Sequence, residues 1–269
     1  MTMQPNGPDP AELDTMLAFA IELAELAARP ALQHFRSQTA VLNKLEAGFD
    51  PVTAADRQTE LVLREAIASR FPDHGILGEE HDEKAGTSPW RWVVDPIDGT
   101  RSFICGTPTW MTLIGLEYES QPVVGVASQP FTGEIFAGNG HEAFVIRDQL
   151  RHPLRSTSVT ALADVLAGTT GPEIYKSLGH QIQLERIAGA VRHLRFDADA
   201  YFHCMVAAGQ LGISLDTGLK PYDIAALIPI VKGAGGIITT WTGHAAADGG
   251  DIIAAGNPHL HEAALKLLG

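Results

Sequence analysis

Two stretches with helical spacing open the chain. Apolar residues between 11 and 36 recur at every third or fourth position, the spacing of one face of an amphipathic helix. Residues 56–70 repeat this pattern and stop before Pro72. Pro10 and Pro30 stand at the edges of the first pattern. We therefore predict two helices before residue 72.

Short runs rich in β-branched residues follow from residue 92. Glycine, proline or asparagine bounds each run, which predicts strands. These strands are expected at 92–95, 111–118, 122–130 and 134–139. The turns at Gly133 and at 138–140 are short, so neighbouring strands are expected to be antiparallel.

Strand and helix patterns alternate after residue 150, which predicts α/β layers. Strands are expected at 164–170, 192–196, 211–216, 235–241 and 251–256. Helices are expected at 173–190, 199–209, 222–233 and from 258 onward. We divide the chain into an N-terminal α+β subdomain, 1–150, and a C-terminal α/β subdomain, 151–269.

Composition narrows the class of protein. A chain of 269 residues with 45% apolar residues can bury a core, which excludes a disordered or fibrous protein. The net charge of −13, without a cluster of basic residues, argues against a nucleic-acid partner. No leader or long apolar run is present, so we expect a cytoplasmic protein without a membrane partner. Cys105 and Cys204 fit no disulfide or zinc spacing and are expected to be reduced core thiols.

The segment Asp-Pro-Ile-Asp-Gly at 95–99 is the strongest chemical signal. Asp95 ends an apolar run, and Asp98 can face the same point with the Ile97 carbonyl between them. Hard divalent cations such as magnesium prefer oxygen ligands of this kind. In isolation, however, the same five residues are more typical of an ordinary turn than of a metal site.

Three other segments change that balance. DPVTAAD (50–56), GEE (78–80) and YDIAALIPIVKGAGG (222–236) accompany DPIDGT (95–100) in the chain. Together, in order and spacing, they resemble the motifs of the inositol monophosphatase family of metal-dependent phosphatases. The resemblance covers residues 11–269. It implies an α+β fold, a layered αβαβα sandwich of the inositol monophosphatase and fructose-1,6-bisphosphatase type, and commonly a homodimer.

The same resemblance implies two or three magnesium ions at one site. It would place a first ion among Glu79, Asp95, the Ile97 carbonyl and Thr100. A second ion would lie among Asp95, Asp98 and Asp223, and Glu79 would also reach a third, weaker ion.

The resemblance also implies how water and phosphate are held. Asp56 and Thr100 resemble the pair that orients the attacking water, and Glu79 acts beside them. The amides of Gly99 and Thr100, next to Asp98, resemble the phosphate cradle. Metal-activated water needs no serine, cysteine or histidine nucleophile. The histidines without ligand spacing are interpreted as surface or packing residues: His34, His74, His81, His203 and His244.

Four further residues near these motifs have two interpretations each. Lys44 is either close to metal or phosphate or a solvated lysine, and Asp50 is a turn or cap residue rather than a ligand. Glu80 either supports a metal ligand from outside or is a solvated acid. Arg101 either screens the acidic site or holds phosphate, or it is an interface or surface arginine.

The alcohol half of the substrate must be recognised outside these motifs. Lys220-Pro221-Tyr222 stands where inositol phosphatases usually carry Cys and Trp, and 218–236 resembles the histidinol-phosphatase branch of the family. Asp199 and Asp216 fall at positions resembling a substrate-facing loop. Two carboxylates there suit an amine and an imidazole better than a neutral polyol. Asp199 is also a candidate helix cap.

The leading hypothesis is therefore hydrolysis of a small phosphorylated metabolite, L-histidinol phosphate, to L-histidinol and phosphate. An inositol-1-phosphate or other sugar-phosphate monophosphatase is the alternative within the same class, and a nucleotide 3'-phosphatase is a more remote one. A catalytically silent, metal-binding regulator on the same fold is the non-enzyme alternative. The intact set of acidic motif residues argues against silence.

Overall fold

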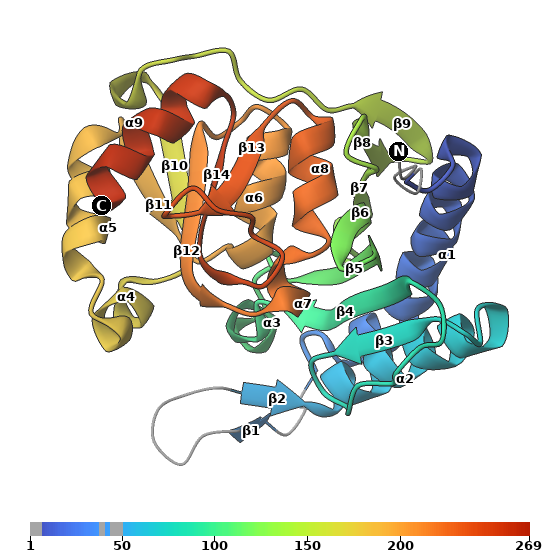
Figure 1. Cartoon of the computed structure of the whole chain (residues 1–269). Helices are drawn as coiled ribbons and strands as arrows, with labels where there is room; N and C mark the ends of the chain where they lie inside the picture. Colours follow the sequence, from blue (N-terminus) through green and yellow to red (C-terminus); the bar gives the residue numbers. More distant parts are fainter. Residues whose placement is uncertain (1–6, 38–40, 44–50) are drawn as a thin grey trace.

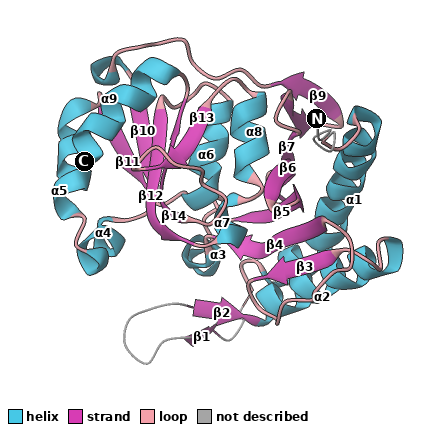
Figure 2. Ribbon diagram, in the orientation of Figure 1, coloured by secondary structure: helices cyan, strands magenta, loops and turns pink. Residues whose placement is uncertain are grey.

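Helices and sheets alternate in five layers, α, β, α, β and α (Figures 1 and 2). The structure is a computed structural model that describes residues 7–37, 41–43 and 51–269. Lys44 and Asp50, for which the sequence suggests roles, lie outside these ranges. The layered α+β class predicted from the sequence is confirmed.

The first sheet has seven strands in the order β3-β4-β5-β6-β7-β8-β9. β3 and β4 are parallel, and every later pair is antiparallel, as the short turns predict. The strands are β3 (Gly75–Gly78), β4 (Trp90–Asp98), β5 (Met111–Tyr118), β6 (Gln121–Gln129), β7 (Glu134–Gly138), β8 (Ala143–Arg147) and β9 (Leu150–Pro153). β3, β8 and β9 were not predicted.

Helices α1 (Pro10–His34) and α2 (Ala54–Arg70) cover the outer face of this sheet. The Asp9 side chain caps α1 by accepting a hydrogen bond from the backbone N–H of Ala11, 3.1 Å away. Pro30 lies inside the helix rather than at its edge, so this part of the prediction was wrong. Its ring is buried, and this burial offsets the helical hydrogen bond that a proline cannot donate.

Helices α6 (Asp199–Ala207) and α8 (Leu227–Gly233) fill the space between the two sheets. Their apolar side chains join one core with residues of both sheets, such as Phe136 and Ile252. This layer lies close to the first sheet. A Cβ at Gly125 on β6 would clash with the carbonyl oxygen of Ala226, so only glycine allows this approach. The middle layer therefore holds the two halves of the chain in a fixed relation.

The second sheet has five strands in the order β11-β10-β12-β14-β13. β10 is parallel to β11 and β12, whereas β14 is antiparallel to β12 and β13. The strands are β10 (Leu166–Thr169), β11 (His193–Phe196), β12 (Ile213–Leu219), β13 (Ile237–Thr240) and β14 (Gly250–Ala255). The outer helices are α4 (Pro172–Leu178), α5 (Gln181–Ala190) and α9 (Pro258–Leu268).

Short elements complete the chain and carry parts of the site. They are the hairpin β1 (Val41–Asn43) and β2 (Pro51–Thr53), helix α3 (Thr100–Cys105), the 3-10 turn η1 (Leu162–Asp164) and helix α7 (Pro221–Ile224). No helix in the described ranges is long and apolar enough to cross a bilayer.

Three predictions about the second half and the cysteines need correction. The helix expected at 173–190 is divided, because Gly179 has a left-handed φ of 80° and ends α4. The helix expected at 222–233 is likewise divided into α7 and α8. Cys204 is a buried core thiol as expected, but Cys105 is exposed at the end of α3.

Candidate active site

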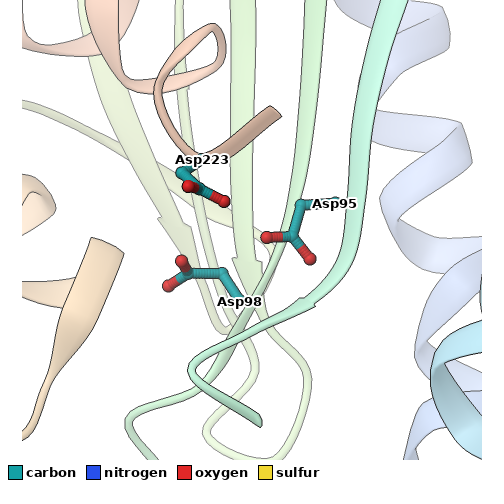
Figure 3. Close-up of side chains that lie close together, drawn as sticks. All are labelled: Asp95, Asp98 and Asp223. Atoms are coloured by element: carbon teal, nitrogen blue, oxygen red, sulfur yellow. The ribbon is translucent and has the colours of Figure 1, made fainter. Parts of the chain in front are cut away.

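Three carboxylates from two distant segments meet at one point. Asp95 and Asp98 lie on β4, and Asp223 lies on α7, which approaches the end of that strand (Figure 3). One oxygen of each lies within 4.8 Å of the others. Asp95 is only 2% exposed, and the other two are half-buried. The cluster is therefore a partly desolvated group of acids rather than a solvated surface.

A β-bulge explains how two aspartates three positions apart reach the same point. Residues three apart on a regular strand point to opposite faces of the sheet. Here Asp95 pairs with Leu113 but Asp98 pairs with Met111, so β4 has one extra residue. The segment 95–99 is thus a bulged strand end followed by α3, and not the tight turn considered from the sequence.

Backbone amides orient all three carboxylates. Asp95 accepts a hydrogen bond from the N–H of Ile97 (3.0 Å), and Asp98 from the N–H of Ala200 (2.9 Å). Asp223 accepts one from the N–H of Lys220 (2.6 Å), at the start of α7. In each aspartate one oxygen is fixed by the backbone, which fixes the direction of the other.

Burial and mutual repulsion raise the pKa values of these acids. Burial contributes most to the raised pKa of Asp95 and of Asp98, and also raises the pKa of Asp223 to about 7. Neighbouring negative charges add to this effect, and the Lys220 amide opposes it at Asp223. The charged neighbours that raise the pKa are Glu79, Asp98, Asp223 and Asp56 for Asp95, Asp199, Asp223 and Asp216 for Asp98, and Glu79 and Asp199 for Asp223.

The donor set fits a hard divalent cation. Asp95, Asp98 and Asp223 offer carboxylate oxygens, which suit magnesium, calcium or manganese better than a thiol-binding metal. A cation among them would favour the charged form of acids that burial disfavours. The carbonyl of Ile97 lies in the same strand end, and the Thr100 hydroxyl donates a hydrogen bond to it (3.1 Å).

Glu79 and Asp56 reach the same region from other elements. Glu79 follows β3 and lines the cavity beside Asp98 and Asp223. Asp56, in the first turn of α2, is 1% exposed, and its charge contributes to the raised pKa of Asp95. The structure thus brings both predicted residues to the cluster.

Glu60 is a supporting residue that the sequence reasoning missed. Its carboxylate is fully buried and accepts hydrogen bonds from the N–H of Glu80 (2.7 Å) and from Arg64 Nε (2.6 Å). It therefore fixes the turn that carries Glu79. The available signal was its position one helical turn after Asp56, on the same face of α2.

A cavity of about 520 Å³ extends from the carboxylate cluster toward the second sheet. Gly99, Thr100 and Arg101 form one wall at the start of α3. Gly99 has a φ of 76°, and a Cβ there would approach Asp199 Oδ2 to 2.8 Å. Glycine is therefore required both by the backbone conformation and by the space.

Asp199 on α6 and Asp216 on β12 also line this cavity. Burial, followed by the charge of Asp216, raises the pKa of Asp199 to about 6. The Thr170 hydrogen bond and the charge of Arg101 act in the opposite direction and lower this pKa. Asp199 does not cap the helix it begins: the N-cap of α6 is Ala198, and no side chain among the described residues caps it. The capping interpretation is wrong, and the carboxylate is available for another role.

Of the remaining candidates, Arg101 lines the cavity and Glu80 does not, whereas Lys44 and Asp50 lie outside the described residues. Arg101 is exposed and forms an ion pair with Glu173 of α4, with 3.5 Å between the charged atoms. Glu80 is half-buried, and its backbone N–H is held by Glu60. His203, interpreted as a surface or packing residue, is 1% exposed and lies 3.0 Å from Asp216.

The chain as a whole is similar to several known proteins. The model of the inositol monophosphatase family matches residues 12–269. The histidinol-phosphatase of Chlorobaculum parvum is 38% identical over 250 residues, which cover 90% of this chain and 92% of that protein. The histidinol-phosphatase of Mycobacterium tuberculosis is 34% identical over 220 residues, 81% of this chain and 84% of that protein. The solved inositol monophosphatase of Zymomonas mobilis has a TM-score of 0.82 at 33% identity, covering 97% of this chain and 99% of that one.

Proposed function

This chain belongs to the inositol monophosphatase family of metal-dependent phosphatases, and from that premise we propose that it hydrolyses L-histidinol phosphate to L-histidinol and phosphate. It is a phosphoric monoester hydrolase, as its named relatives are. We propose in addition that the alcohol released is L-histidinol, that the metal is magnesium, and that individual residues of the cavity have the roles given below.

The observation that carries the choice of alcohol is the second group of acids in the cavity. Asp199 and Asp216 lie beyond the metal-type cluster, on the wall contributed by α6 and β12. A phosphate monoester bound at the cluster would extend its alcohol toward them. Carboxylates favour a cationic amine or imidazolium over a neutral polyol. The named histidinol-phosphatases among the relatives support the same choice.

We assign the phosphate end of the cavity to two or three magnesium ions. Asp95, Asp98 and Asp223, with Glu79 and the Ile97 carbonyl, would hold them. The chemistry that magnesium supplies when bound is neutralisation of phosphate charge, acidification of water and stabilisation of the leaving oxygen. The amides of Gly99 and Thr100 would bind phosphate oxygens.

The water-orienting role is assigned to Thr100 and Asp56. The Thr100 hydroxyl donates a hydrogen bond to the Ile97 carbonyl, so its lone pairs are directed elsewhere and can accept a hydrogen bond from water. Asp56 is a buried acid, and its charge acts on Asp95. The pair would hold a water molecule by two acceptors, with its oxygen turned toward phosphorus.

A second candidate is an inositol-1-phosphate phosphatase. The similarity to the Zymomonas mobilis inositol monophosphatase, over nearly the whole of both chains, favours it. That candidate predicts a substrate contact through neutral hydroxyl groups, and it gives Asp199 no cation to bind.

A substrate panel separates the two candidates. Phosphate release with saturating magnesium is measured for L-histidinol phosphate, myo-inositol 1-phosphate, fructose 1,6-bisphosphate and a 3',5'-bisphosphate nucleotide. We expect L-histidinol phosphate to have the highest kcat/KM. A higher value for myo-inositol 1-phosphate would overturn the choice of alcohol while leaving the phosphatase assignment intact.

A further inference from the structure

A buried ion-pair partner lies behind the substrate wall of the cavity. His203, on α6, is 1% exposed, and its Nε2 lies 3.0 Å from Oδ2 of Asp216 on β12. The other ring nitrogen, Nδ1, is buried and has no hydrogen-bond partner in the described part of the chain. Burying an unpaired polar atom is costly. An apolar side chain would fill this space without an unpaired nitrogen. The contact with Asp216 is therefore what the histidine adds at this position.

Asp216 is held on both of its oxygens. Oδ2 faces His203, which must carry its proton on Nε2 to donate to a carboxylate. Oδ1 accepts from the Thr170 backbone N–H (2.7 Å), the Thr170 hydroxyl (2.6 Å) and the Thr169 hydroxyl (3.2 Å). Asp216 is 3% exposed. Its carboxylate is thus engaged by the protein and anchors the end of β10.

The anchored Thr170 connects Asp216 to Asp199. The Thr170 hydroxyl lies between the two acids: its one proton points to Asp216 Oδ1, 2.6 Å away, and is shared with the Asp199 carboxylate, whose pKa it lowers. Asp199 begins α6 with a left-handed φ of 38°, a conformation that a non-glycine residue adopts only when its surroundings hold it. Asp199 and His203 are four residues apart on one helix, so the contacts form a closed ring through α6, β12 and the end of β10.

We propose that His203 is a positioning residue for recognition of the alcohol, acting through Asp216 and Thr170 on Asp199. In this assignment Asp199 is the group that contacts a cationic alcohol, and Asp216 is its support. The inference rests on the proposed function, because it gives Asp199 a cation to bind. Without the Nε2–H donor, Oδ2 of Asp216 loses its partner, so Asp216 and the Thr170 side chain that it holds are fixed less firmly beside Asp199.

The test compares two substitutions at one position. His203→Leu fills the space without a donor, and His203→Gln places an amide N–H close to the former Nε2. The control is His261→Leu. His261, on α9, is also buried, and its Nε2 lies 2.7 Å from the hydroxyl of Thr239 on β13. Steady-state kcat and KM are measured with magnesium for L-histidinol phosphate and for the neutral-alcohol ester β-glycerophosphate.

For His203→Leu we expect the KM for L-histidinol phosphate to rise about tenfold, the scale of one lost hydrogen bond to a charged group, with kcat changed less than about threefold. The kcat/KM for β-glycerophosphate should change less than about threefold. His203→Gln should recover most of the KM, and His261→Leu should leave the preference between the two substrates unchanged.

An equal loss on both substrates, or an unchanged KM, would overturn the positioning role. If His203→Leu fails to fold, Thr170→Val removes the bridging hydroxyl at a half-buried site, and the same selective rise in KM is required of it. The unsubstituted enzyme distinguishes a failure of the proposed function from a failure of the role of His203. If it does not prefer L-histidinol phosphate, the proposed function fails; if it does and the variants keep that preference, only the role of His203 fails.

Discussion

The two ends of the cavity are built in different ways. At the phosphate end, backbone amides orient the aspartates, and two of the three contacts join residues two or three positions apart: Asp95 with Ile97 and Asp223 with Lys220. At the alcohol end, contacts between α6, β10 and β12 position the acids, such as His203 with Asp216. The first arrangement depends mainly on local sequence, and the second on the packing of the whole C-terminal half.

This difference suggests which end tolerates change. A carboxylate held by its own neighbouring backbone keeps its place when distant side chains vary. A carboxylate held by side chains from other elements changes its place when any of them is substituted. We expect substitutions at the phosphate end to abolish turnover of every substrate, and substitutions at the alcohol end to alter the preference among substrates.

The largest effect is expected for Asp95→Asn. This change keeps the shape and removes the charge of the most buried ligand candidate, so kcat should fall about a thousandfold or more on every substrate. Far-UV circular dichroism should be unchanged. The matched control is Asp248→Asn, an exposed acid that does not line the cavity, which should keep normal activity. Near-normal turnover of Asp95→Asn would refute the metal assignment.

A smaller and selective effect is expected for Asp199→Asn. Loss of the carboxylate should lower kcat/KM for L-histidinol phosphate about 30-fold or more, the scale of a broken pair of close charges, while β-glycerophosphate is affected much less. The measurement is the ratio of the two kcat/KM values. A ratio that does not change would remove Asp199 from the alcohol site and would contradict the proposed division of the cavity.

A still smaller effect, at the phosphate end of the cavity, is expected for Glu60→Gln. The amide weakens the contacts that fix the turn at Glu79, so the magnesium concentration for half-maximal activity should rise about tenfold, as for other substitutions behind a metal ligand. Glu65→Gln, an exposed acid on the same helix, serves as the control. Unchanged magnesium dependence would show that Glu60 has no part in placing Glu79.

The smallest effect concerns stability and pH without metal. The folded-state pKa of Asp223, about 7, lies above its ordinary value of 3.8, so between these values the folded chain binds more protons than the unfolded chain. Stability must therefore fall as pH rises through this window. We expect the Tm of the metal-free protein to be lower at pH 7.5 than at pH 5, and magnesium to reduce the difference. A Tm that rises with pH would contradict the repulsion within the cluster.

How much the sequence reveals follows the same division. The phosphate end was predictable, because DPIDG, GEE and the Asp223 segment keep their chemistry in short motifs. The geometry of this end was not predictable. The bulge between Asp95 and Asp98 depends on how β4 pairs with β5, and no local sequence pattern indicates that pairing. The layers followed from periodicity and resemblance, but the division at Gly179 did not, because an apolar repeat continues across a break that one left-handed residue makes.

The alcohol end was only partly predictable. Asp199 and Asp216 could be named from the resemblance, but the sequence did not distinguish a helix cap from an available carboxylate. His203 gave no signal, since a lone histidine in an apolar helix is more often a packing residue. Its partner lies 13 positions away on another element, and only the fold brings the two together.

The most direct test of the two-ended cavity is a crystal structure with manganese and L-histidinol phosphate, using a slowly turning variant such as Asp56→Asn. We predict anomalous density among Asp95, Asp98 and Asp223, the phosphate beside it, and the substrate amine or imidazole in contact with the Asp199 carboxylate. A bound substrate whose phosphate lies at the metal while its cationic groups point away from Asp199 into solvent would contradict it.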